Sequence, residues 1–236
     1  MKGVDVAARF APALDLGGDL YDFIVPESNS LVIAVGDVSG KGVPAALYSA
    51  LAGELVRSRT FRRRYAPDGI SPAGVLASMN TILHERQLEE YYCTLCYAFF
   101  DFKRRTVTMA NSGLHYPIRS RQAARSAGEG AVADPPPAAI EVAGVPLGAF
   151  PGSSYDELTL ELTAGDLFVL CTDGIFEARD RRGRDFGSAR LQQVVAKTRG
   201  QSAGGVVDEI FDAVRRFRGE ARVNDDMTAV AVKITG

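Results

Sequence analysis

The sequence has no tryptophan, two histidines, three cysteines and little excess charge, since 27 basic and 29 acidic side chains leave a net charge of −2 among 236 residues. An odd number of cysteines provides no framework of paired disulfides. No apolar run approaches the ~20 residues of a membrane span, and no signal peptide is evident. Near-neutral charge gives no electrostatic basis for nucleic-acid binding. These absences favour a cytoplasmic chain with neither nucleic acid nor membrane as a partner.

The few cysteines and histidines carry little chemistry by themselves. Cys93 and Cys96 lie in a strand-like run, where positions three apart point to opposite faces, so their thiols cannot share a metal ion. We interpret both of them, and Cys171, as small core residues. His84 and His115 lie outside the acidic segments described below, and we expect each to be a surface or hydrogen-bonded histidine.

What the sequence does have is enough apolar surface for a sizeable core, with 46% hydrophobic and 24% charged residues. Apolar stripes at helical spacing predict helices at 43–59, 71–85, 188–198 and 203–218. Shorter apolar runs predict strands at 20–25, 30–36, 93–101, 106–110, 157–162, 167–172 and 227–234. This irregular order favours an α+β fold. We expect residues 1–236 to form a single domain with one mobile loop, at 122–137, where Ala, Gly and Pro are abundant.

Four short acidic segments carry the strongest functional signal. They are Gly17-Gly18-Asp19, Gly36-Asp37-Val38, Thr172-Asp173-Gly174 and Asn224-Asp225-Asp226. Two of them end a predicted buried strand, and the other two precede one. The adjacent glycines allow the sharp turns and close approaches that a ligand site needs. Each segment therefore sets a carboxylate at the end of a strand.

Carboxylates gathered in this way would require a cation. Two of them about 5 Å apart repel by about 3 kcal/mol at an effective dielectric constant near 20. Oxygen-only ligation, without His or Cys, favours Mg²⁺ or Mn²⁺ over Zn²⁺ or copper. The alternative is that each aspartate merely caps a turn, as Asp beside Gly often does. Four segments of the same design favour the metal site.

The order and spacing of these motifs resemble the SpoIIE-type serine/threonine phosphatases, bacterial members of the metal-dependent PPM superfamily. The resemblance covers nearly the whole chain. Its most specific segments are Gly17-Gly-Asp-Leu-Tyr-Asp-Phe23, Gly36-Asp-Val-Ser-Gly-Lys-Gly-Val-Pro44, Thr172-Asp-Gly-Ile-Phe-Glu177 and Asn224-Asp-Asp-Met-Thr228. It implies a four-layer αββα sandwich, in which two mainly antiparallel sheets are flanked by helices.

The resemblance also implies roles for individual residues around two ions, Mn²⁺ or Mg²⁺. Asp37 matches the carboxylate that bridges both ions, and the Val38 carbonyl is a further ligand. Asp173 and Asp225 match the ligands of one ion, and Asp19 the acidic ligand of the other. These four aspartates would be catalytic through the metals and an activated water, which would attack phosphorus without a covalent phosphoenzyme.

Several neighbouring positions have alternative roles or depart from the family pattern. Asp226 is a candidate ligand for a third, weaker ion or a metal-bound water, whereas we expect Asp22 to be structural. Ser39 stands where eukaryotic relatives carry a histidine often assigned as general acid, and no arginine matches their phosphate-binding residue. Lys41 could assist with phosphate, although a loop lysine is more often only solvated.

By the same resemblance, the expected activity is hydrolysis of phosphoserine or phosphothreonine on a phosphorylated STAS-domain anti-sigma-factor antagonist in a bacterial partner-switching pathway. The alternative is a non-catalytic adaptor of the same fold that binds a sigma-factor regulator. The complete set of acids favours the enzyme. We further expect an upstream sensor or receiver domain in a longer protein, and the sequence leaves a homodimer open.

Overall fold

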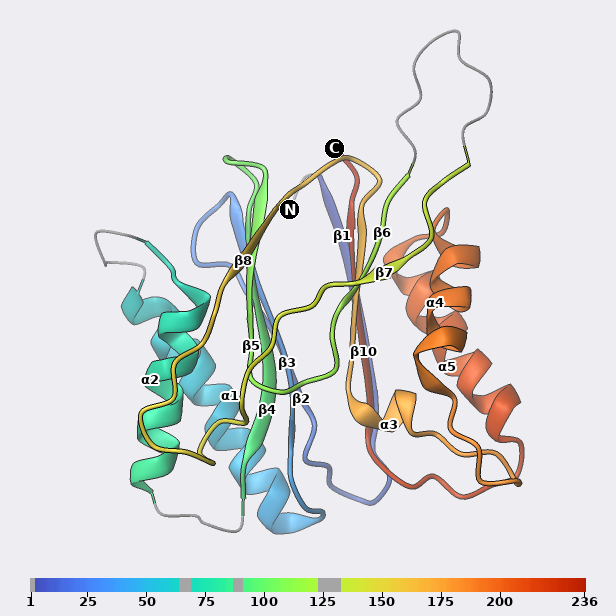
Figure 1. Cartoon of the computed structure of the whole chain (residues 1–236), viewed down its shortest axis with the longest axis horizontal. Coiled ribbons are helices and arrows are strands. Elements are labelled where there is room, and N and C mark those ends of the chain that lie inside the picture. The colour runs from blue at the N-terminus through green and yellow to red at the C-terminus, as the bar shows by residue number, and fades with distance from the viewer. Residues whose placement is uncertain (1–2, 64–68, 87–90, 123–132) are drawn as a thin grey trace, which may run out of the picture.

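The computed structural model, which describes residues 3–63, 69–86, 91–122 and 133–236, has two β-sheets packed face to face between two pairs of helices (Figure 1). Helices α1 and α2 cover one outer face, and α4 and α5 cover the other. The predicted αββα sandwich is therefore confirmed. Most of the loop predicted at 122–137 lies outside the described residues.

All strand pairs within the two sheets are antiparallel. One sheet has the order β1 (Val4–Ala11), β10 (Met227–Ile234), β9 (Leu167–Cys171), β6 (Ile118–Ser120) and β7 (Ala138–Ala139). The other has the order β2 (Leu20–Ile24), β3 (Ser30–Val38), β4 (Cys93–Asp101), β5 (Thr106–Asn111) and β8 (Leu158–Glu161).

The helices follow the apolar periodicity of the sequence, and two of them begin at a serine cap. They are α1 (Val43–Arg63), α2 (Pro72–Glu85), α3 (Asp173–Phe176), α4 (Gly187–Thr198) and α5 (Ala203–Arg218). Ser71 and Ser202 cap α2 and α5, because each side-chain oxygen accepts a hydrogen bond from a backbone N–H of the first turn. All four predicted helices are confirmed, with small changes at their ends.

Three apolar layers hold the sandwich together. The central layer, between the sheets, contains fully buried side chains from both of them, among them Ile33, Phe100 and Phe168. The outer layers lie between each sheet and its helices. Cys93 belongs to an outer layer and Cys96 to the central one, so the two thiols lie on opposite faces of β4, as predicted.

Two local details differ from the sequence expectations, and both concern the acidic segments. Strand β3 continues to Val38, so Asp37 lies within the strand rather than after it. Asp173 does not sit in a simple turn but begins the short helix α3. The strands predicted from the sequence also omit β1, β6 and β7, of which β6 and β7 have only three and two residues, too few to show a period. No described helix is both long enough and apolar enough to cross a membrane.

Candidate metal centre

The four acidic segments meet at one end of the sandwich. Asp19 immediately precedes β2, Asp37 is the second-last residue of β3, Asp173 begins α3, and Asp225 lies just before β10. Burial raises the pKa of Asp37 to about 9, and the charges of Asp173, Asp19 and Asp225 add to the rise. Carboxylates from both sheets are therefore within electrostatic reach of one another.

Asp19 is held by two threonine hydroxyls from the opposite sheet. The hydroxyls of Thr172 and Thr228 donate to Asp19 Oδ2 at 2.7 and 2.6 Å. Burial raises the pKa of Asp19 to about 6; the two hydroxyls oppose the rise, and the charges of Asp226 and Asp173 add to it. The other oxygen, Oδ1, is buried and has no donor among the described residues. Asp37 lies close enough to hydrogen-bond to Asp19 when one of the two carboxyl groups is protonated. A buried carboxylate oxygen without a donor suits a cation.

Asp173 shares its surroundings with His115, which the sequence analysis placed away from the acidic segments. Burial raises the pKa of Asp173, the charges of Asp225 and Glu177 add to the rise, and His115 opposes it. The His115 ring stacks on Phe176 of α3, with 4.1 Å between ring centroids. The expectation of a surface position is correct, because His115 is exposed, but the fold brings it to the acidic cluster.

Asp226 is engaged by backbone donors. Its two oxygens accept hydrogen bonds from the N–H groups of Ala13 and Gly18, each at 2.7 Å. A Cβ atom on Gly17 would lie 2.5 Å from Asp226 Oδ2, so only glycine allows this approach. Asp226 therefore ties the segment before Asp19 to the start of β10.

Asp225 forms an ion pair with Lys41, whose ammonium group lies 3.0 Å from Asp225 Oδ2 and also donates to the Asn224 carbonyl. For Lys41 the sequence leaves open assistance with phosphate or simple solvation, and half of its side chain is exposed. Its tip, however, is bound to a residue 184 positions away, a contact that nothing in the sequence indicates.

The remaining candidates lie close to this cluster or are turned away from it. A Cβ atom on Gly18 would lie 2.8 Å from the Val38 carbonyl, so this oxygen faces the Asp19 segment closely. Ser39 is bound to backbone, because its hydroxyl accepts from the Tyr92 N–H at 3.0 Å. Asp22 pairs with Arg57 of α1.

The chemistry of these residues suits a divalent cation, but their carboxylates do not surround a single position in this structure. The cluster offers only oxygen donors, one of them buried without a partner, and Asp37 is held where a negative charge is costly. Within the described ranges, no three His, Cys, Asp or Glu side chains already surround one point. Closure would require the carboxylates to turn, and Asp225 would exchange its contact with Lys41 for an ion.

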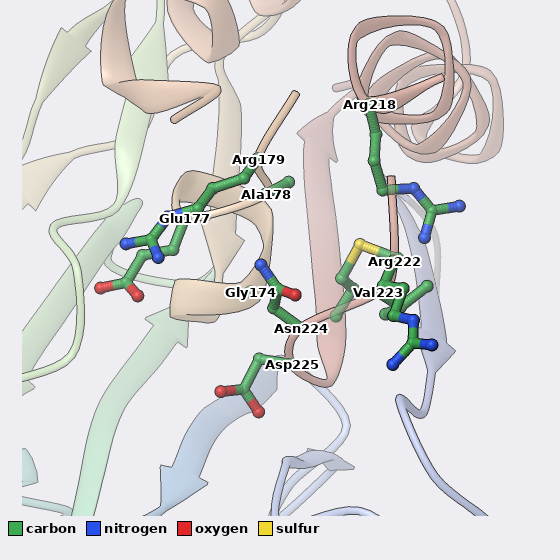
Figure 2. A pocket seen from close by; sticks show the side chains of 10 residues that line it. Gly174, Glu177, Ala178, Arg179, Arg218, Arg222, Val223, Asn224 and Asp225 are labelled. Atoms are coloured by element: carbon green, nitrogen blue, oxygen red, sulfur yellow. The ribbon is translucent and has the colours of Figure 1, made fainter. Parts of the chain in front are cut away.

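A pocket of about 220 Å³ opens beside Asp225 (Figure 2). Its walls come from α3 and the residues after it, from the end of α5, and from the segment before β10. Three arginines, Arg179, Arg218 and Arg222, line it.

Comparison with known proteins agrees with this arrangement. The family described as Stage II sporulation protein E (SpoIIE) matches residues 27–235. The chain is 27% identical to the phosphoserine phosphatase RsbU of Bacillus subtilis, over 98% of this chain and 64% of RsbU, and 25% identical to protein IcfG of Synechocystis, over 96% of this chain and 37% of IcfG. It thus spans less than two thirds of either relative.

Solved structures share the fold at lower identity. The SiaA-PP2C domain of Pseudomonas aeruginosa superposes with a TM-score of 0.80 at 20% identity, covering 97% of this chain and 85% of that one. The catalytic domain of the serine/threonine phosphatase PstP, in complex with two manganese ions, superposes with a TM-score of 0.64 at 15% identity, covering 99% of both chains. The family match and the shared fold together confirm the resemblance: this chain belongs to the SpoIIE family.

Proposed function

We propose that this chain is a metal-dependent protein phosphatase that hydrolyses phosphoserine or phosphothreonine, with a phosphorylated STAS-domain protein as its substrate. The observation that carries the proposal is the meeting of Asp19, Asp37, Asp173 and Asp225 at one end of the sandwich, with Asp19 Oδ1 buried and without a donor. Family membership and the name of RsbU, a phosphoserine phosphatase, support the choice of reaction and substrate class.

The four aspartates and the Val38 carbonyl would hold two Mn²⁺ or Mg²⁺ ions. Such ions supply activation of a water molecule and neutralisation of charge on the phosphoryl group. In this assignment Asp226 is a positioning residue, because both of its oxygens are occupied by backbone N–H groups of the 13–18 segment. A third ion at Asp226 would have to share these oxygens with the backbone donors.

The residues around the acids have distinct tasks. Thr172 and Thr228 fix one oxygen of Asp19 and leave the other directed to the cluster. Lys41 holds a positive charge at the edge of the cluster, where a phosphoryl group would arrive. Ser39 is committed to the Tyr92 backbone, whereas the charge of His115 acts on Asp173.

The test is hydrolysis of p-nitrophenyl phosphate and of a phosphorylated STAS-domain protein, with Mn²⁺ or with EDTA, by the native chain and by Asp37→Asn. We expect turnover that needs the metal and falls at least about a hundredfold in Asp37→Asn, since Asp37 would hold the metal and its loss would remove most of the electrostatic stabilisation that the metal supplies. Asp208→Asn is the matched control, because Asp208 is an exposed carboxylate that pairs with Arg9.

Absence of turnover with Mn²⁺ and, in a parallel assay, with Mg²⁺, together with metal-independent binding of a sigma-factor regulator, would favour the adaptor function instead. Turnover that EDTA leaves unchanged would contradict the metal assignment even if the reaction is correct.

A further inference from the structure

The pocket beside Asp225 contains arginines that the proposed chemistry does not use. Arg218 lies in the last turn of α5, and Arg222 lies in the segment that leads to Asp225. Figure 2 shows these two side chains on one side of the pocket, with Glu177 and Arg179 on the other side. The pocket therefore adjoins the acidic cluster but has the opposite charge along one wall.

The two arginines differ from their neighbours in having no anionic partner. Arg215 and Arg216 of the same helix turn pair with Asp212 and Glu209. Across the described residues, neither Arg218 nor Arg222 forms an ion pair, and the Nε atom of Arg218 is buried without a hydrogen-bond partner. A buried N–H donor without an acceptor is costly unless a ligand satisfies it.

Two of the other charges at the pocket are already paired. Arg179 is bound to Asp185 at 2.9 Å, and Asp225 is bound to Lys41. Among the described residues, the pocket lining thus has two guanidinium groups and one carboxylate, that of Glu177, without an ion pair. They surround a volume of about 220 Å³, which is large enough for one side chain. Planar guanidinium groups match carboxylate geometry, often with two parallel hydrogen bonds.

We propose that this pocket is a substrate subsite that binds an acidic side chain next to the phosphorylated residue, with Arg218 and Arg222 as the binding groups. The inference rests on the proposed phosphatase function and adds a substrate preference to it. Since the pocket wall includes Asp225, a residue bound there would lie beside the site of hydrolysis in the same peptide. These two arginines line the pocket beside Asp225. We therefore assign them to an acidic side chain of the substrate and not to the role of the phosphate-binding arginine in eukaryotic relatives.

The experiment compares phosphoserine peptides that carry glutamates before or after the phosphoserine with matched glutamine peptides. We expect kcat/KM to be about fivefold higher or more for one glutamate peptide, with a preference that weakens as salt is added. The double variant Arg218→Gln, Arg222→Gln should reduce this ratio to about one, and Arg222→Lys should retain part of it. Arg104→Gln, an exposed arginine of the β4–β5 turn, should leave the ratio unchanged.

Binding of the same peptides in EDTA, followed by fluorescence anisotropy, separates this proposal from the proposed function. Turnover without an acidic preference would overturn the subsite and leave the phosphatase. An arginine-dependent preference in binding without any turnover would support the subsite and overturn the phosphatase. If inorganic phosphate abolishes the preference, and the double variant binds phosphate less well, the pocket holds phosphate and the assignment to an acidic side chain is wrong.

Discussion

The ammonium group of Lys41 lies 3.0 Å from the carboxylate of Asp225, so a positive side chain holds one of the proposed metal ligands. The pair joins the loop after β3 to the segment before β10, and thus links the two sheets at the acidic end. An ion that binds Asp225 must compete with this contact.

Removing the lysine should therefore favour metal binding. We expect Lys41→Met to raise the affinity for Mn²⁺ by about twofold to fivefold, the range that a half-exposed ion pair supports. Isothermal titration with Mn²⁺ measures it directly. Lys103→Met, which removes an exposed lysine from the β4–β5 turn, is the control. An affinity that is unchanged or lower in Lys41→Met would mean that the pair organises the site instead of competing with the ion.

Stability without metal should fall as pH rises. The folded-state pKa values of Asp37, about 9, and Asp19, about 6, lie above the ordinary value of 3.8. Between pH 3.8 and about 9, the folded chain thus binds more protons than the unfolded chain. The stability that is present at acid pH is therefore lost as pH rises through 6 and then toward 9. In EDTA, the denaturation midpoint should decrease across this window.

The contribution of Asp37 can be isolated by substitution. Asp37→Asn should be more stable than the native chain at pH 8 in EDTA. Its unfolding free energy should also decrease less steeply with pH, by up to about 1.4 kcal/mol per pH unit, the value for one proton. Urea unfolding at a series of pH values provides the comparison. Saturating Mn²⁺ should stabilise the native chain more than the variant. A native chain that becomes more stable from pH 6 to 8 in EDTA would contradict this account.

Asp226 and Asp225 should differ in what they support, although they are adjacent. Asp226→Asn replaces an acceptor of two backbone hydrogen bonds by a group that can accept only one, and we expect a loss of about 1–3 kcal/mol in unfolding free energy. Asp225→Asn should lose less than about 1 kcal/mol, because its ion pair is partly exposed, but should bind Mn²⁺ poorly. If Asp226→Asn unfolds like the native chain and loses only metal affinity, Asp226 is a ligand rather than a tether.

Gly174 should tolerate no side chain. A Cβ atom there would lie 1.9 Å from the Asp226 carbonyl oxygen, a backbone atom that cannot move without shifting the acidic segment. We expect Gly174→Ala to cost about 1–3 kcal/mol and to impair Mn²⁺-dependent hydrolysis. Gly53→Ala is the matched control, because no atom lies within 4 Å of the new Cβ, and in helix α1 it should gain about 0.5–1 kcal/mol. Equal thermal stability of the two variants would show that the segment before β10 can yield.

The sequence by itself determined the elements and the chemical type of the site. Apolar periodicity is a local property, so it located all four long helices and most strands, and the glycine-flanked aspartates marked the acidic segments. The layered arrangement followed from the family resemblance, since periodicity alone cannot say which sheets pack together.

Only the tertiary structure decided which groups meet. Thr172, Thr228 and Lys41 each contact an aspartate far away in the chain. His115 approaches Asp173 from the loop between β5 and β6. The arginine pocket likewise combines the end of α5 with the segments after Asp173 and before β10. Such contacts depend on strand order and register, which a local sequence pattern does not reveal. Burial and Coulomb interactions act through space and not along the chain, so the pKa shifts in the site follow from the fold.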